Sequence, residues 1–230
     1  NGMADDYRNF LFEHYLAIVD RYQPDLFIFE NVPGILSAAP HGKKVSEIIP
    51  KEFLKKGYEI TTNLKGAIVN AANYNVAQNR KRVILVGVRR KSFEKNDIQK
   101  MLDDFYQTIL PSHRCKRTLT VKDVIGKMPS LTPYWDQEHH LKKISHSTPI
   151  CGVTWHVPRY NNLRDMDTFK LLAEDLESGR NEYDSKKIAE LYEKKIGSKS
   201  PIHRYHVLNP NEPSTTIIAH LHKDGNRFIH

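Results

Sequence analysis

Two groups of polar residues stand beside apolar runs that predict strands. Glu30 and Asn31 directly follow the apolar run 26–29, and three consecutive cations, Arg80 to Arg82, lead into the apolar run 83–88. A carboxylate in such a place can act as a general acid or base, or it can simply cap the turn that follows. The cations can hold an anionic ligand, or they can be a solvated strand end. Position alone leaves both pairs of alternatives open.

The run 26–29 is the element that would position the carboxylate. It is bounded by Pro24 and by Pro33-Gly34, which predicts a short strand buried on both faces of a parallel sheet. Open α/β sheets bind their ligands at the carboxyl ends of such strands. Glu30 would therefore stand at the edge where a ligand lies.

Helices are predicted on both sides of this strand. Asp5 or Asp6 can cap the first helix, which would end near Gln23 because Pro24 follows. The second covers 44–56 and contains Pro50, which predicts a kink or two short helices. The first helix is expected to bury one apolar stripe, made of Phe10, Leu11, Tyr15, Ile18, Val19 and Tyr22.

The segments 58–69 and 82–88 are rich in β-branched residues and predict two further strands. The segment between them is too short for a crossover helix, so the two strands are expected to be antiparallel neighbours at one edge of an otherwise parallel sheet. Alternation along the second strand would point Arg80 and Arg82 the same way and Lys81 the opposite way.

Composition narrows the class of partner. The net charge of +8 and the pI of 9.3 favour a polyanion, since Lys and Arg displace counterions from phosphates. Cys115 and Cys151 are too few for a disulfide framework and lack metal-ligand spacing. No apolar run approaches the ~20 residues of a membrane span, so a soluble, cytoplasmic protein is expected.

Four short motifs follow one another in order along the chain. They are Arg8-Asn9 before Leu11-Phe12, then Glu30-Asn31-Val32, then Gln78-x-Arg80-x-Arg82, and finally Pro213-Ser214-x-Thr216-Ile217. The ordered set resembles the motifs of the bacterial cytosine-5 DNA methyltransferase family. The resemblance implies an α/β fold, in which part of a Rossmann-like methyltransferase sheet with an antiparallel edge strand is joined to a smaller mixed target recognition domain.

The resemblance also assigns roles to the polar residues. Glu30 would be the acid that contacts ring nitrogen N3 and the exocyclic amine of a flipped cytosine, and Asn31 would brace its loop. Arg82 and Arg80 would hold base oxygen O2 and the flanking phosphate, and Gln78 would also bind substrate. The parent enzyme would move a methyl group from S-adenosylmethionine to carbon 5 of a cytosine in double-stranded DNA, in the bacterial cytoplasm. A cognate restriction endonuclease would be its genetic partner in a restriction-modification system, whereas an orphan methylase would have none.

Two departures from the family pattern carry expectations of their own. The family usually has Gly where this chain has Asn75, and Asn tolerates a positive φ better than most other residues, so the turn can survive. The family's Pro-Cys nucleophile motif and its Phe-x-Gly-x-Gly cofactor motif are missing from these residues. The chain is therefore expected to be an internal fragment, with the S-adenosylmethionine site largely outside it and no activity by itself.

The resemblance divides the chain at 130, with 1–130 in the catalytic domain, 131–210 as target recognition domain and 211–230 as a return segment. Two amphipathic helices are predicted at 164–179 and 183–197 in the recognition domain. The DNA-facing candidates among its polar and aromatic residues are Arg159, Asn162 and Arg204.

One alternative remains open for residues 131–210, and one for the function of the chain. The aromatic and basic residues can simply pack a loop-rich surface, and the many histidines show no metal-binding motif, so no metal site is predicted. The alternative function is a non-catalytic, sequence-specific DNA-binding module that kept the methyltransferase fold.

Overall fold

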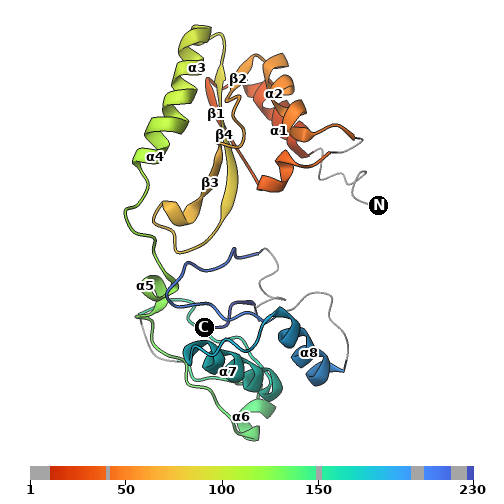
Figure 1. The fold of residues 1–230 in the computed structure, drawn as a ribbon, viewed down its shortest axis with the longest axis vertical. Coiled ribbons are helices and arrows are strands. Elements are labelled where there is room, and N and C mark those ends of the chain that lie inside the picture. The colour runs from red at the N-terminus through yellow and green to blue at the C-terminus, as the bar shows by residue number, and fades with distance from the viewer. Residues whose placement is uncertain (1–10, 40–41, 149–151, 198–204, 219–226) are drawn as a thin grey trace. The chain divides into compact units, whose positions relative to one another are not determined.

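The computed structural model describes residues 11–39, 42–148, 152–197, 205–218 and 227–230. The chain divides into two compact units, Asn1–Thr118 and Leu119–His230 (Figure 1). This division falls earlier in the chain than the expected domain boundary at 130. The assignment of 131–210 to target recognition and of 211–230 to a return segment stays a prediction.

The first unit is mixed α/β and is built on a four-stranded antiparallel sheet. β4 (Lys81–Arg89) pairs with β1 (Leu26–Asn31), with β2 (Tyr58–Ile60) and with β3 (Ile68–Asn70). The predicted antiparallel pairing is therefore confirmed, but the segment 58–69 does not form the one strand that was predicted, because β2 and β3 are separate. The predicted edge position of the second strand is wrong, because β4 lies between β1 and β2. The prediction of an otherwise parallel sheet is also wrong, because every strand pairing among the described residues is antiparallel.

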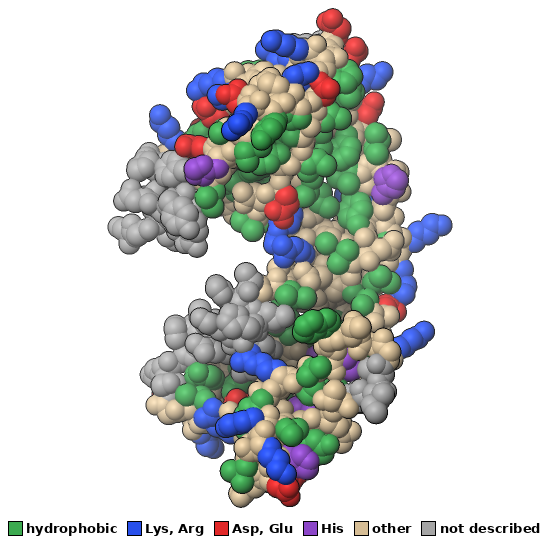
Figure 2. Space-filling view, turned by 180° about the vertical axis from the view of Figure 1, so that it is seen from behind, with side chains coloured by type: hydrophobic (Ala, Val, Ile, Leu, Met, Phe, Trp, Pro, Cys, Tyr) green, Lys and Arg blue, Asp and Glu red, His purple; other side chains and the backbone are tan. Residues whose placement is uncertain are grey.

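β1 is covered on one face only. Phe27 and Phe29 are buried, whereas Leu26 and Ile28 are 53% and 66% exposed. The prediction of a strand buried on both faces is wrong, because the helices that pack on Phe27 and Phe29 leave the alternate side chains uncovered within the described residues. Hydrophobic side chains accordingly reach the surface among the charged ones (Figure 2).

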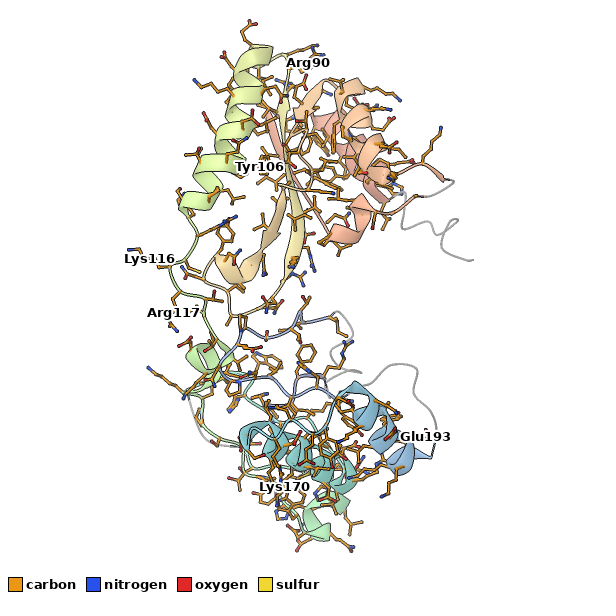
Figure 3. All side chains as sticks on the ribbon, viewed as in Figure 1. Arg90, Tyr106, Lys116, Arg117, Lys170 and Glu193 are labelled. Atoms are coloured by element: carbon orange, nitrogen blue, oxygen red, sulfur yellow. The ribbon has the colours of Figure 1, made fainter. Side chains whose placement is uncertain are left out.

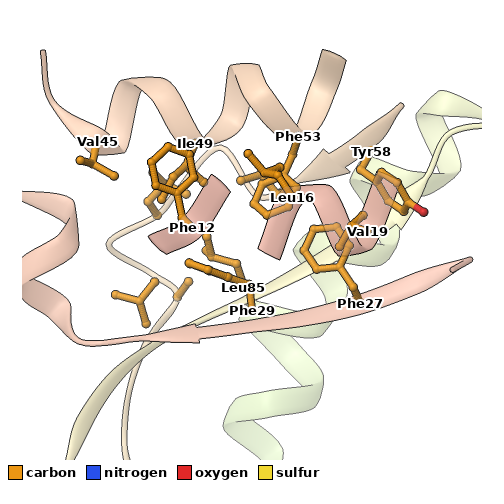
Figure 4. Close-up of a cluster of buried hydrophobic side chains, with 14 residues drawn as sticks. Phe12, Leu16, Val19, Phe27, Phe29, Val45, Ile49, Phe53, Tyr58 and Leu85 are labelled. Carbon is orange, nitrogen blue, oxygen red and sulfur yellow. The ribbon is translucent and has the colours of Figure 1, made fainter. Parts of the chain in front are cut away.

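α1 (Leu11–Tyr22) packs on the covered face of the sheet (Figure 4). It buries Phe12, Leu16 and Val19, which follow one another at intervals of four and three residues. Among the described members of the predicted stripe, only Val19 is buried, and Tyr15 is partly buried. The exposed members of that stripe are Leu11, Ile18 and Tyr22. Phe10 and the proposed caps Asp5 and Asp6 lie outside the described residues.

α2 (Val45–Lys55) lies on the same face and is one helix, with Pro50 inside it. The predicted division into two short helices is therefore wrong, and the alternative, a kink at Pro50, stays a prediction. A proline inside a helix removes one backbone hydrogen bond, but Val45, Ile49 and Phe53 are fully buried against the sheet and hold both halves in place.

Aromatic rings fill the space between these helices and the sheet. The Phe27 ring stacks on Phe53 with the ring centroids 4.5 Å apart, and Tyr58 meets Phe27 edge-on. The Phe27 ring also covers Gly87 on the neighbouring strand, where a β-carbon would overlap it. Glycine is therefore required at this position by close approach of the ring.

A second, smaller core covers part of the opposite face. α3 (Lys95–Asp104) continues through one π-helical turn, η5 (Phe105–Ile109), into α4 (Leu110–Ser112). Ile98 and Leu102 of α3 pack on Val88 of β4, with Val86 and Tyr106 partly buried beside them. Residues 95–112 thus form one continuous helical segment, with a change of helix type near its end.

The second unit contains α5 (Val121–Ile125), α6 (Gln137–Leu141), α7 (Leu163–Glu177) and α8 (Ser185–Ile196). The helices predicted at 164–179 and 183–197 are confirmed as α7 and α8. Named strands do not occur among the described residues of this unit, which has two isolated bridges, Pro133 with His146 and Val207 with Ile229.

Buried polar side chains hold the loops of the second unit together. The Ser145 hydroxyl, only 2% exposed as a residue, donates to the Arg159 carbonyl at 3.2 Å and accepts from the Asn161 amide at 3.1 Å. His140 is also buried, and its Nε2 donates to the Tyr134 carbonyl at 2.8 Å. The loop around residue 160 is therefore fixed to the hairpin-like segment 132–147.

No helix in the described part of the chain is long and apolar enough to cross a membrane.

Candidate functional site

Glu30 and Arg82, which lie far apart in the sequence, form an ion pair in the first unit. Glu30 lies opposite Ile84 in the pairing of β1 with β4, and Arg82 is two residues from Ile84 on the same face. Arg82 Nε lies 2.8 Å from Glu30 Oε1. The Arg82 side chain is 17% exposed and the Glu30 side chain 50% exposed, so the carboxylate is open to a ligand while the guanidinium is mostly covered.

Two of the three neighbouring cations fit the alternation that the sequence predicts. Lys81 is exposed and Arg82 half-buried, as expected of successive residues on opposite faces of a strand. Arg82 Nη1 donates to the Lys81 carbonyl at 2.7 Å, which helps to fix the guanidinium plane. Arg80 is half-buried just before the strand, and its carbonyl accepts from the Ala71 amide at 3.0 Å. The direction of the Arg80 side chain toward a ligand stays a prediction.

Asn31 holds the turn that follows Glu30. Its Oδ1 accepts from the Val32 amide at 2.8 Å, directly before Pro33 opens the short 3-10 helix η2 (Pro33–Leu36). Glu30 therefore lies within the paired strand β1, one residue before this contact, and its backbone has little freedom.

The loop that leads to β4 is also held by short polar contacts. Asn70 Oδ1 accepts from the Ala72 amide at the start of the 3-10 helix η4 (Ala71–Asn73). Asn75 has a φ of 59°, which confirms that this asparagine adopts the left-handed conformation expected where the family has Gly. The Gln78 amide donates to the Val76 carbonyl at 2.7 Å. Gln78 therefore lies in a tight turn, and its contact with substrate stays a prediction.

Tyr106 supports the strand that carries Arg82 and was missed by sequence reasoning. From η5 it points to β4 (Figure 3), where its hydroxyl donates to the Ile84 carbonyl at 2.8 Å and accepts from the Val86 amide at 2.9 Å. It thereby satisfies backbone groups of β4 between the stretches that pair with β2 and β3. Burial raises the pKa of the Tyr106 hydroxyl, which keeps it protonated as a donor. No local pattern in the sequence marks this tyrosine.

The predicted DNA-facing residues of the second unit have unlike environments. Arg159 is exposed on the loop that Ser145 fixes. Asn162 caps α7: its Oδ1 accepts from the Asp165 amide at 2.9 Å and its Nδ2 donates to the Asp165 carboxylate at 3.0 Å. A structural role for Asn162 is therefore visible, and its contact with DNA stays a prediction. Arg204 lies outside the described residues. In the described part of the chain no group of three His, Cys, Asp or Glu residues could hold a metal ion.

Comparison with known proteins decides the family. The family model for C-5 cytosine-specific DNA methylases matches residues 1–227. The chain belongs to this family.

Several named type II methyltransferases are similar to this chain. The type II methyltransferase M.Bpa9945I of Bacillus paralicheniformis is 29% identical over 100% of the chain and 53% of its own length. M.XorII of Xanthomonas oryzae pv. oryzae is 41% identical over 37% of the chain and 19% of its own length. M.MthTI of Methanothermobacter thermautotrophicus is 32% identical over 56% of the chain and 34% of its own length. The chain thus spans about half the length, or less, of these relatives.

Among solved structures, a prophage-encoded DNA modification methyltransferase from E. coli, described as putative in its own title, resembles the chain with a TM-score of 0.44. The sequence identity is 23%, over 92% of this chain and 58% of that one.

Proposed function

We propose that this chain carries the base-binding part of a DNA (cytosine-5-)-methyltransferase, in which Glu30 and Arg82 bind a flipped cytosine. The observation that carries the proposal is their 2.8 Å contact, which joins two motifs from distant parts of a chain of this family. An acid and a guanidinium that touch each other can bind neighbouring ring atoms of one base, here N3 and O2. The ion pair therefore has the composition and compactness of a site for one edge of cytosine.

The chemistry explains why an acid is needed there. Carbon 5 of cytosine is a poor nucleophile until a thiolate adds at carbon 6, and the negative charge that develops on the ring must then be stabilised. Glu30 can stabilise it through N3 and the exocyclic amine, since its half-exposed carboxyl can contact an incoming base. Arg82 positions Glu30 before the base binds and then contacts O2. S-adenosylmethionine would supply the methyl group. No described residue here is assigned to the thiolate or to that cofactor.

The surroundings of the reaction belong to the same proposal. The sheet of the first unit would be part of a Rossmann-like catalytic domain, and residues 131–210 would form the target recognition domain that reads double-stranded DNA. Type II methyltransferase names among the relatives support a restriction-modification system with a cognate endonuclease, in the bacterial cytoplasm.

The experiment compares two adjacent cations in an enzyme of full family length. Arg82→Ala should lower single-turnover methylation by a similar factor on a cognate duplex and on a duplex altered by one base, because Arg82 contacts a base that is already chosen. Lys81→Ala is the matched control and should leave the rate nearly unchanged, since Lys81 faces away. Equal losses in both variants would overturn the site and would indicate only a diffuse phosphate-binding patch.

Recognition is tested separately from the base-binding site. Arg159→Ala in the second unit should change the preference between the two duplexes or reduce the salt dependence of binding. A loss of rate that is equal on both duplexes, with unchanged salt dependence, would contradict a recognition role for Arg159.

A further inference from the structure

The loop 152–158 of the second unit presents a tryptophan almost entirely to solvent. Trp155 is 96% exposed, whereas the other tryptophan of the chain, Trp135, is 43% exposed and lies under the Lys170 ammonium. Val157, two residues on, is 68% exposed. An indole is among the largest apolar surfaces a protein has, so its full exposure is unfavourable unless a partner covers it.

The exposed indole stands on a strained part of the backbone. Trp155 has a φ of 63°, a conformation that side chains with a β-carbon rarely adopt. Its carbonyl accepts from the Val157 amide at 2.8 Å, which closes a tight turn directly after it.

Contacts on both sides of the turn anchor the loop. His156 Nε2 donates to the Pro129 carbonyl at 2.8 Å. On the far side, the Ser145 hydroxyl fixes the Arg159 carbonyl. The loop is thus fastened on both sides of its turn, while its apolar tip is left to solvent. A strained and anchored backbone that carries an exposed aromatic side chain is typical of a binding loop.

The charge around the loop indicates which partner would cover it. No Asp or Glu occurs between Glu138 and Asp165, an interval that includes Lys142, Lys143, Arg159 and Arg164 together with four histidines. Lys142 pairs with Glu138 and Arg164 with Asp165, whereas Lys143 lies over the Tyr160 ring and Arg159 is exposed. These cations would not help to bind a purely apolar protein surface. Single-stranded or unpaired nucleic acid is a polyanion with exposed aromatic base faces, so it complements both the cations and the indole.

We propose that Trp155 stacks on an unpaired base of locally opened DNA, with Arg159 near the adjacent phosphate. The inference rests on the proposed function, which requires a base pair to open so that the cytosine can leave the helix. An opened pair leaves one base without a partner, and its ring face fits a rigid, exposed indole.

The loop offers a direct optical test in the 230-residue chain. With Trp135→Phe, Trp155 is the single tryptophan, and its emission should be that of an indole in water. Three probes are added in turn: a duplex with one abasic site, the same duplex fully paired, and heparin. Only the abasic duplex holds an unpaired base, so it should quench Trp155 several-fold more than the paired duplex, while heparin should bind without quenching.

Variants at two exposed apolar positions separate stacking from general contact. Trp155→Ala should weaken binding of the abasic duplex by about 5- to 150-fold, the range found when one base-stacking aromatic is removed. Trp155→Leu should lose nearly as much, because it keeps an apolar side chain but has no aromatic face. Leu141→Ala, at a position 82% exposed in the same unit, is the control and should not change affinity.

Each negative result of these experiments contradicts a different part of the argument. Duplex binding seen by fluorescence anisotropy without quenching would overturn the stacking and leave the proposed function standing, and so would equal quenching by heparin. Blue-shifted emission before any probe is added would show that protein already covers Trp155, and would overturn the inference in favour of an internal contact. If the chain binds none of the duplexes, DNA recognition by this unit fails, and the stacking fails with it.

Discussion

Replacing Glu30 by Gln should separate catalysis from folding. The substitution keeps the shape of the side chain and an acceptor for Arg82, but it removes the charge and the dissociable proton. In an enzyme of full family length, turnover should fall by about 100-fold or more, as expected when a general acid is lost. Affinity for DNA should change little, because phosphate contacts dominate it.

The effect on stability should be small, and its size follows from the geometry of the pair. Two unit charges 2.8 Å apart attract by about 1.5 kcal/mol at the dielectric constant of water and by about 6 kcal/mol at an effective value of 20. Desolvation of the guanidinium and ordering of both side chains oppose this attraction, and half of the Glu30 side chain is in solvent. We therefore expect a coupling energy near 1 kcal/mol, the upper range for partly exposed pairs.

The assay is a double-mutant cycle of Glu30→Gln and Arg82→Ala. Urea unfolding of the 230-residue chain measures the coupling, and single-turnover methylation by the longer enzyme measures catalysis. Asp25 and Arg89 form a second ion pair at the other end of the same two strands, 2.7 Å apart, so Asp25→Asn is the matched control. It should perturb folding slightly and leave methylation intact. Methylation at an unchanged rate by Glu30→Gln would refute the reasoning, as would a coupling of about 3 kcal/mol, which is typical of a buried structural pair.

Three further predictions concern folding and are all measured by urea unfolding. Gly87→Ala should destabilise the first unit by about 2 kcal/mol, because a methyl group would displace the Phe27 ring, and Phe27→Leu should recover part of that loss. Asp175→Ala should destabilise the second unit by about 2 kcal/mol, because the buried carboxylate accepts from the amides of Glu182 and Tyr183, whereas Glu174→Ala at an exposed position should not. Burial raises the pKa of Tyr205 to about 12, so the unfolded chain loses this proton first and stability should fall between pH 10 and 12. Tyr205→Phe should reduce that fall, and Tyr22→Phe, at an exposed position, should not.

Local signals in the sequence were sufficient for elements with clear ends. α7 and α8 begin directly after Asn162 and Asp184, whose side chains cap the first turn, and α8 is followed by Gly197 in the left-handed conformation. The face that α1 buries could not be predicted in the same way. Both of its stripes are apolar at helical spacing, and only the sheet beneath selects the one with Phe12, Leu16 and Val19.

The candidate site likewise has features that the sequence predicts and features that it does not. Motif order in the sequence placed Glu30 and Arg82 in one site, and strand alternation placed Lys81 on the other face. The support from Tyr106 depends on how a distant helix packs on β4, and the exposure of Trp155 depends on which loops fold over it. Neither property can be predicted from the neighbouring residues in the sequence, because both depend on tertiary contacts.

Register is what turns the two motifs into one site. A slip of one residue between β1 and β4 would move Glu30 away from Arg82 and reverse the faces of the whole strand. The Phe27 ring opposes such a slip, because Gly87 is the only glycine in β4 and the only place where the ring can lie against the strand. With Phe27 opposite Gly87, Glu30 must lie opposite Ile84, and Arg82 follows on the same face. A glycine without any chemical function therefore determines where the proposed acid meets its arginine, so the loss in Gly87→Ala should extend from stability to methylation.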